Sequence, residues 1–140
     1  MELDRRRTLP QGVARLACAE LACAVAALHA AGIAHRAVRP DAVLVDAQGH
    51  LRLADYASAL ALASAKSADE LPLHLGGADA QRRAEYHAPE QLSRGAALGV
   101  GVDYWALGCV LFELSVGETP FAAQEPRRRA HAAHAETHAA

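Results

Sequence analysis

Three histidines near the carboxyl end have a spacing that could serve a metal site. His131, His134 and His138 stand at positions i, i+3 and i+7, so a helix would bring them to one face. Three imidazoles in such an arrangement can bind zinc or nickel. The surrounding segment is rich in alanine, however, and compositional bias is the interpretation that we prefer. The arginine run at 127–129 is likewise interpreted as solvated charge rather than as a nucleic-acid contact.

The cysteines and the glycine pair predict no further reactive site. Cys18, Cys23 and Cys109 form no CxxC motif and are odd in number, which favours reduced thiols over disulfides or a zinc ribbon. The glycines at 99 and 101 form a lone GxG with no later helix glycine, so we do not expect a nucleotide-binding loop there.

A series of short motifs in the middle of the chain resembles the protein kinase family. Residues 28–59, LHAAGIAHRAVRPDAVLVDAQGHLRLADYASA, are similar to the catalytic loop, the hairpin after it and the metal-binding turn of kinases. Residues 88–90 match the A-P-E motif that closes the activation segment. Residues 103–108 resemble the start of the central helix of the C-terminal lobe, and residues 117–121 resemble the turn after it. The resemblance covers residues 9–121 and is closest to Ser/Thr kinases.

The departures from this family pattern concern the chemistry itself. Phosphoryl transfer depends on positioned charges, a proton acceptor and metal ions. Ala37 stands at the catalytic-base position and Ala42 at the position of the metal-binding asparagine. Arg39 replaces the catalytic-loop lysine with a wider, planar cation. Asp55 remains as a candidate magnesium ligand, but we prefer to interpret it as a turn residue, because Mg²⁺ normally needs substrate phosphates as well.

The resemblance implies structural or regulatory roles for four other residues. We expect His35 to be a packing residue, and Asp103 to cap the central helix and hydrogen-bond the catalytic loop. Arg36 either receives a phosphate from the activation segment or bonds nearby carbonyl groups, and both interpretations stay open. No hydroxyl occurs at 81–83, where a phosphothreonine would be usual. Glu90 is expected to lack the arginine that pairs with it in the family.

The resemblance also implies that the N-terminal lobe of a kinase is absent. That lobe carries the Gly-rich loop, the phosphate-anchoring lysine and its paired glutamate. Only about one and a half helices precede His35, and the single lysine, Lys66, lies downstream of Asp55. The sequence therefore predicts a partial kinase C-terminal lobe without its phosphate grip.

Hydrophobic spacing predicts two helices and one small hairpin around these motifs. The first helix opens at Thr8 or Gln11, ends at Gly32 and has an apolar face formed by Val13, Leu16, Ala17, Leu21, Ala24, Val25 and Leu28. Residues 16–34 are the single membrane candidate, but Glu20, His29 and the alanine content favour a core helix over a span. The apolar runs 43–46 and 51–54 predict a β-hairpin.

The second predicted helix, from Asp103 to Val116, is apolar on every face apart from Glu113, and Gly117 ends it. In a complete kinase lobe, other helices would bury it on all sides. Here its large side chains cannot all face inward. Those side chains are Trp105, Leu107, Val110, Leu111, Phe112 and Leu114. We therefore expect a marginally stable chain or a protein partner that covers this surface.

Composition limits the remaining possibilities. The chain has 140 residues, of which 52% are hydrophobic, but 35 residues are alanine, so the core must be thin. The net charge of −2 provides no field for nucleic acid or an anionic membrane. We predict one domain over residues 1–121 and a poorly ordered Arg/His/Ala-rich tail over 122–140. The segment 55–84 has no regular pattern, and its serines (58, 64 and 67) are candidate phosphosites.

The sequence thus predicts a mostly α fold of the α+β kinase family, acting as a non-catalytic, pseudokinase-like interaction module with no cofactor. The location expected by default is the cytoplasm, because the amino terminus has no secretory signal. One alternative is an active Ser/Thr kinase that uses Mg-ATP and whose N-terminal lobe lies elsewhere. The other is a gene-model fragment with no selected role.

Overall fold

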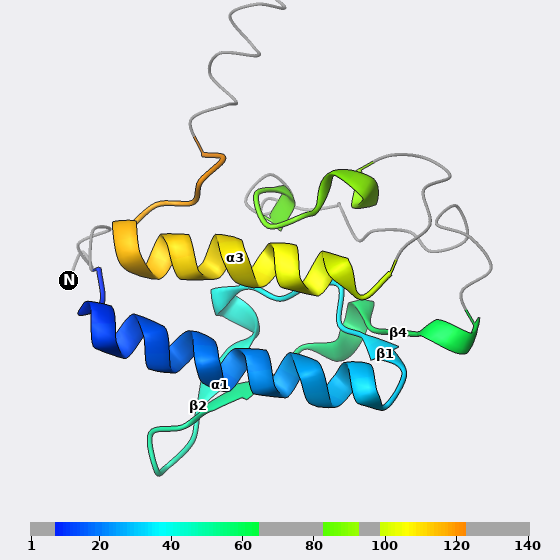
Figure 1. Ribbon diagram of the computed structural model, residues 1–140, viewed down its shortest axis with the longest axis horizontal. Coiled ribbons are helices and arrows are strands. Elements are labelled where there is room, and N and C mark those ends of the chain that lie inside the picture. Colours follow the sequence, from blue (N-terminus) through cyan, green and yellow to red (C-terminus); the bar gives the residue numbers. More distant parts are fainter. Residues whose placement is uncertain (1–7, 65–82, 93–98, 123–140) are drawn as a thin grey trace, which may run out of the picture.

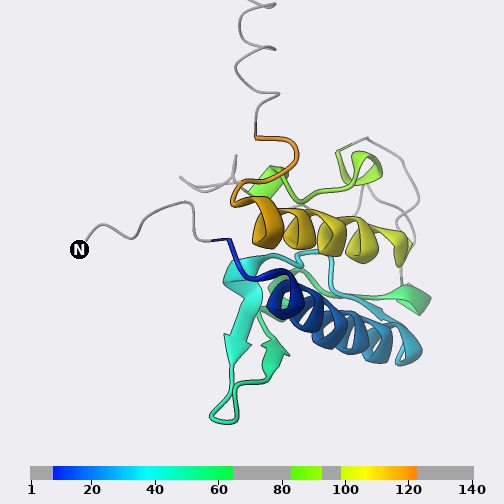
Figure 2. The same ribbon diagram turned by 60° about the vertical axis from the view of Figure 1, so that its left-hand side comes forward.

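Two long helices and two small antiparallel sheets make up the computed structural model, which describes residues 8–64, 83–92 and 99–122 (Figure 1). Helix α1 spans Gln11–Ala30 and helix α3 spans Gly101–Val116. The two helices lie side by side and run in opposite directions (Figures 1 and 2). The predicted mostly α fold is confirmed.

Helix α1 begins and ends where the sequence predicts. Pro10 precedes it, and the Pro10 carbonyl accepts hydrogen bonds from the N–H groups of Val13 and Ala14 at 2.9 and 3.0 Å. At the other end Gly32 has φ of +74°, the left-handed conformation that favours glycine after a helix. By length and composition α1 could cross a membrane. Its buried residues Leu21 and Val25 nevertheless belong to the core of the described chain, as the sequence predicts for a core helix.

The predicted apolar face of α1 is wrong in its first turns. Val13 and Leu16 are 50% and 63% exposed, and Ala14, which is not part of the predicted face, is buried. Ala17, which the prediction places on that face, is buried as expected. Leu9 donates its N–H to the Leu114 carbonyl at 2.9 Å, which holds the start of α1 close to the end of α3. The small alanines lie at this close approach, so the two larger side chains lie on the outside.

The predicted hairpin is confirmed as β2, Val43–Val45, paired with β3, Leu51–Leu53, in antiparallel register. The sequence analysis missed a second sheet, in which β1, Ile33–Ala34, pairs with β4, Leu60–Ala61. Four short 3₁₀ helices lie in the described connections between these elements. They span Pro40–Ala42, Tyr56–Ser58, Leu62–Ser64 and Pro89–Gln91. The rest of the irregular 55–84 segment, residues 65–82, lies outside the described residues, and so does the tail from 123.

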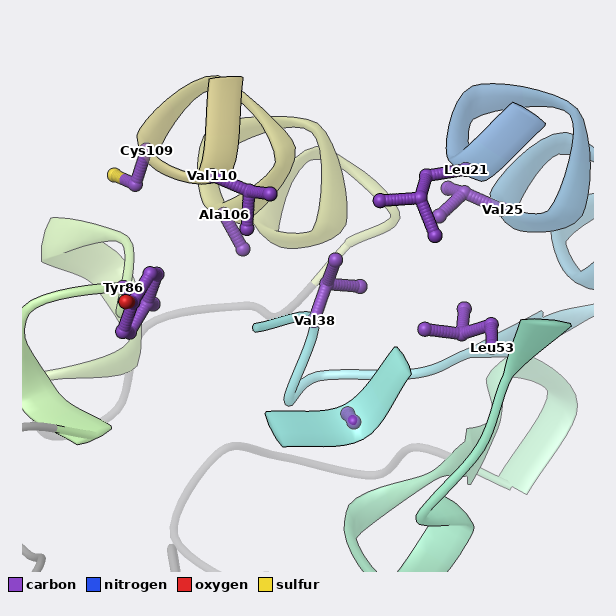
Figure 3. Close-up of a cluster of buried hydrophobic side chains, with 9 residues drawn as sticks. Leu21, Val25, Val38, Leu53, Tyr86, Ala106, Cys109 and Val110 are labelled. Atoms are coloured by element: carbon purple, nitrogen blue, oxygen red, sulfur yellow. The ribbon is translucent and has the colours of Figure 1, made fainter. Parts of the chain in front are cut away.

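The core lies between the two helices and the hairpin (Figure 3). Val38 points from its loop toward the space between α1 and α3, so the loop that carries the kinase-like motif is itself part of the core. The buried cluster consists of Leu21, Val25, Val38, Ala42, Leu53, Tyr86, Ala106, Cys109 and Val110. Packing of Val38 in this cluster limits the movement of the loop.

Helix α3 differs from the prediction at its start. It begins at Gly101 with Val100 in the capping position, so the prediction that Asp103 is the N-cap is wrong. Asp103 lies in the first turn and is fully buried. Three large apolar side chains of α3 are partly exposed: Trp105 by 39%, Leu111 by 38% and Phe112 by 41%.

Candidate functional site

Asp103 holds the loop that carries the candidate catalytic positions. Its Oδ2 accepts the backbone N–H of His35 at 2.8 Å, and its Oδ1 accepts that of Arg36 at 2.7 Å. The His29 ring on α1 adds an Nε2–Oδ2 contact of 2.8 Å. This buried carboxylate therefore joins α3, α1 and the loop, and the expected hydrogen bonds to the loop backbone are present.

A second anchor comes from Gln91, which sequence reasoning missed. The Gln91 side chain accepts the N–H of Ala88 at 2.9 Å and donates from Nε2 to the Arg36 carbonyl at 3.2 Å. Arg36 thus has its N–H bound by Asp103 and its carbonyl bound by Gln91, in a left-handed conformation with φ of +66°. The position of Gln91 directly after the A-P-E motif does not by itself indicate this role, because its partner Arg36 lies 55 residues away in the sequence.

His35 packs inside the fold, as expected from the resemblance. Its side chain is fully buried and donates from Nε2 to the Ala54 carbonyl at 2.8 Å. Its ring meets that of Tyr56 edge-on, with the ring centroids 5.1 Å apart. The histidine therefore links the loop to the turn that contains Asp55.

Asp55 faces a cation rather than an empty coordination site. Arg39 donates from Nη2 to Asp55 Oδ2 at 2.8 Å, and the Asp55 side chain is 42% exposed. Asp55 itself has φ of +57°, a left-handed conformation that Asp tolerates better than most residues. The side chain of Ala42 is buried in the core and has no oxygen that could bind a metal ion. Within the described residues, no group of three His, Cys, Asp or Glu side chains could hold a metal ion.

Positive charge gathers around Ala37. A cavity of about 10 Å³ lies beside Ala37, and its lining includes Arg36, Arg39, Arg83 and His87. Burial lowers the pKa of His87 first, and the nearby Arg39 and Arg36 lower it further. Burial also lowers the pKa of the Arg36 guanidinium, although the Asp103 carboxylate opposes that change. The Ala37 methyl group therefore lies beside three arginines and the His87 ring, whose lowered pKa favours the neutral form, at the position where the resembling family has a carboxylate.

The A-P-E region is tied to the end of α3 by other acids. Thr119 donates its hydroxyl to Glu85 Oε2 at 2.6 Å, and Tyr86 donates its hydroxyl to Glu113 Oε2. None of the described residues forms an ion pair with Glu90.

The candidate phosphosite Ser58 lies at the end of the 3₁₀ helix Tyr56–Ser58 and is half-buried.

Several predicted features lie outside the described residues. They are Lys66, Ser67, the 81–82 part of the activation segment, the arginines at 127–129 and the histidines at 131, 134 and 138.

Comparison with known proteins gives a consistent picture. The family model described as protein kinase domain matches residues 1–139. Protein kinase C zeta type of Oryctolagus cuniculus is 38% identical over 119 residues, which cover 85% of this chain and 19% of that protein. Atypical protein kinase C of Drosophila melanogaster is 37% identical over 119 residues, with 85% and 18% covered. Serine/threonine-protein kinase DBF20 of Saccharomyces cerevisiae is 33% identical over 150 aligned positions, with 85% and 27% covered. The chain thus spans less than a third of each of these relatives.

Proposed function

Because this chain belongs to the protein kinase family, we propose that it is a member that transfers no phosphate and acts as an interaction module. The observation that carries the proposal is the Arg39–Asp55 ion pair of 2.8 Å. Of the two positions that bind metal ions in the family, only position 55 keeps a side chain that can bind a metal. In this structure the Arg39 guanidinium is paired with that Asp55 carboxylate. A magnesium ion at Asp55 would have to displace that guanidinium or tolerate its charge.

The other chemical groups point the same way. Ala37 can accept no proton from a substrate hydroxyl, so general-base assistance from this position is absent. The side chain of Ala42 has no oxygen for a metal ion and is buried in the core, and its backbone carbonyl accepts the N–H of Ala54 at 2.7 Å. The described residues therefore do not fit Mg-ATP, and no step of the proposed function uses it.

A phosphotransfer assay tests this proposal. A mixture of the purified chain of residues 1–140 with ATP, magnesium and a generic acceptor peptide should give no transfer above background. Asp55→Ala is the matched variant, because it removes the last candidate metal ligand. Turnover in the wild type that Asp55→Ala abolishes would overturn the proposal.

Nucleotide binding is a separate measurement. Millimolar ATP with magnesium should leave the unfolding midpoint of the chain unchanged. A ligand of micromolar Kd at millimolar concentration would add about 4 kcal/mol of stability, which is easy to detect. A magnesium-dependent rise in the midpoint would show that Asp55 binds the metal despite Arg39.

The named relatives favour a second candidate function, that of an active Ser/Thr kinase. Each of those relatives is named as a kinase and is much longer than this chain. The coding sequence next to this chain discriminates between the two. An in-frame segment with a glycine-rich loop and an anchoring lysine would favour the enzyme, although Ala37 would still lack the base.

The interaction surface that we propose is the outer face of α3. Five large apolar side chains of α3 are between 38% and 49% exposed: Tyr104, Trp105, Leu111, Phe112 and Val116. A large apolar side chain left half exposed forgoes about 1 kcal/mol of burial energy. We therefore propose a protein partner with an apolar face of its own, and a cytoplasmic location for the complex.

Dye binding and sedimentation test this surface. The chain should bind the hydrophobic dye ANS and self-associate when no partner is present. The double substitution Leu111→Ser with Phe112→Ser should lower both signals, whereas the exposed control Arg15→Gln should not. A monomeric wild-type chain that binds no ANS and unfolds cooperatively above about 60 °C would refute the idea that this surface needs a partner.

A further inference from the structure

The groups around Ala37 include buried side-chain nitrogen atoms without a hydrogen-bond partner among the described residues. Arg36 Nε, Arg39 Nε and His87 Nδ1 are all buried, and none has a hydrogen-bond partner among the described residues. Arg36 is only 4% exposed and lines the same small cavity as Arg39 and His87. A guanidinium can only donate hydrogen bonds, so Arg36 Nε and Arg39 Nε require an acceptor from outside the described part of the chain. The His87 Nδ1 atom donates or accepts according to the tautomer of the ring.

The carboxylates nearby do not supply that acceptor. Both oxygens of Asp103 already accept hydrogen bonds from backbone N–H groups and contact His29. Asp55 binds Arg39 through Nη2, which leaves Arg39 Nε unsatisfied. In the described ranges, no carboxylate oxygen lies within 4.0 Å of a guanidinium nitrogen of Arg36 or Arg83. Buried positive charge without a partner is costly, so an anion that enters here would be bound favourably.

The size of the cavity selects the chemistry of that anion. About 10 Å³ accommodates one water-sized atom. A flat carboxylate can place one oxygen in the cavity and keep the other outside, in the planar geometry that arginine prefers. The Ala37 methyl group forms part of the wall, and a longer side chain there would occupy the space.

We propose that Arg36, Arg39, Arg83 and His87 form a binding site for a carboxylate group. The group comes from a small free carboxylate or from an Asp or Glu side chain of a partner protein. This site goes beyond the proposed loss of phosphotransfer and does not depend on it, since its tests measure binding and stability and involve no catalysis.

The first experiment compares sodium formate with sodium chloride at equal ionic strength, using the chain of residues 1–140 at pH 7. Formate up to about 100 mM should raise the unfolding midpoint by roughly 2–5 °C in a saturable way, and chloride should not. Equal effects of the two salts would overturn the proposal. Inorganic phosphate serves as a third probe, and binding of phosphate more than tenfold tighter than formate would overturn the assignment to carboxylate.

Variants locate the effect. Ala37→Asp provides a covalent carboxylate, so it should abolish the response to formate and raise the midpoint in its absence. Because this variant can fail to fold, Arg83→Gln provides a second test and should weaken formate binding at least about threefold. The control Arg15→Gln changes an exposed arginine on α1 and should keep the wild-type response. An unchanged response in Arg83→Gln would overturn the proposed site.

Peptides distinguish the two sources of the carboxylate. A peptide with one central glutamate and its glutamine counterpart are titrated against the chain. Tighter binding of the glutamate peptide, by about tenfold and in competition with formate, assigns the site to a partner side chain. Equal binding of both peptides, together with a saturable formate response, assigns it to a free carboxylate. If neither formate nor the glutamate peptide binds, the proposal is wrong.

Discussion

Replacing Asp103 by alanine should be one of the most damaging single changes in this chain. The side chain is fully buried and its two oxygens bind the N–H groups of His35 and Arg36 and the ring of His29. The substitution to alanine leaves two buried peptide N–H groups without an acceptor and separates α3 from the loop. No other described carboxylate accepts hydrogen bonds from this loop's backbone, so the loss is not compensated.

The expected magnitude follows from these contacts. A hydrogen bond to a charged group contributes about 1.5–3 kcal/mol, and breaking a buried charged network by removing one partner costs about 3–5 kcal/mol. We expect Asp103→Ala to lower the free energy of unfolding by about 3–5 kcal/mol, against a total of about 5–15 kcal/mol for a domain. Asp103→Asn keeps one acceptor oxygen but turns an NH₂ group toward an N–H donor, so it should lose roughly half as much.

Urea unfolding followed by tryptophan fluorescence measures this loss, because Trp105 is the single tryptophan of the chain and lies on α3. Asp41→Ala is the matched control, since Asp41 is an exposed acid just beyond the same loop. If Asp103→Ala does not fold, Asp103→Asn gives the readout, together with faster amide exchange at His35 and Arg36. An unfolding free energy for Asp103→Ala within about 1 kcal/mol of the control would refute the reasoning.

Three further predictions concern one glycine and two histidines. Gly32→Ala should lower the free energy of unfolding in urea by about 1–2 kcal/mol, because φ at Gly32 is +74°. Gly12→Ala on α1, where the space around the Cα is open, should raise it by about 0.5–1 kcal/mol. Equal effects of the two substitutions would contradict the conformational explanation. Burial is the main cause that holds the pKa of His87 below its ordinary value of 6.5. The folded state therefore favours the neutral ring, and stability should decrease as pH falls below 6.5. His87→Gln should flatten that pH dependence, and an unchanged slope would show that another group causes it. Hydrogen bonding to Glu20 raises the pKa of His50 above 6.5, so this contact stabilises the fold below 6.5 and is lost as pH rises through the folded pKa. In an NMR titration, Glu20→Gln should move the His50 midpoint back toward 6.5, and a midpoint that does not move would argue against the pair.

Local patterns in the sequence were sufficient for the helices and the hairpin. Alternation in the runs 43–46 and 51–54 predicted β2 and β3, and Gly32 and Gly117 predicted the helix ends. Both glycines have positive φ, at +74° and +89°. These signals act over a few residues, so they need no knowledge of the rest of the fold.

Contacts between distant residues were not predictable in this way. The β1–β4 sheet joins two strands of two residues each, too short to leave a periodic pattern. Asp103 was predicted as a helix cap because an acid at a helix start favours that role. The N-cap is Val100, so only the capping role is wrong: the expected hydrogen bonds of Asp103 to the loop are present, at the N–H groups of His35 and Arg36.

The sequence by itself determined which chemical groups are missing. The side chains of Ala37 and Ala42 can supply neither a base nor a metal ligand, because a methyl group has neither a lone pair nor a proton to exchange. Only the tertiary structure decided what surrounds those methyl groups. It pairs Arg39 with Asp55 across 16 residues and brings Arg36 and His87 to one small cavity across 51. Such neighbours are set by the packing of Val38 between two helices and by the hydrogen bonds of Asp103 and Gln91, and residue spacing along the chain carries no record of either.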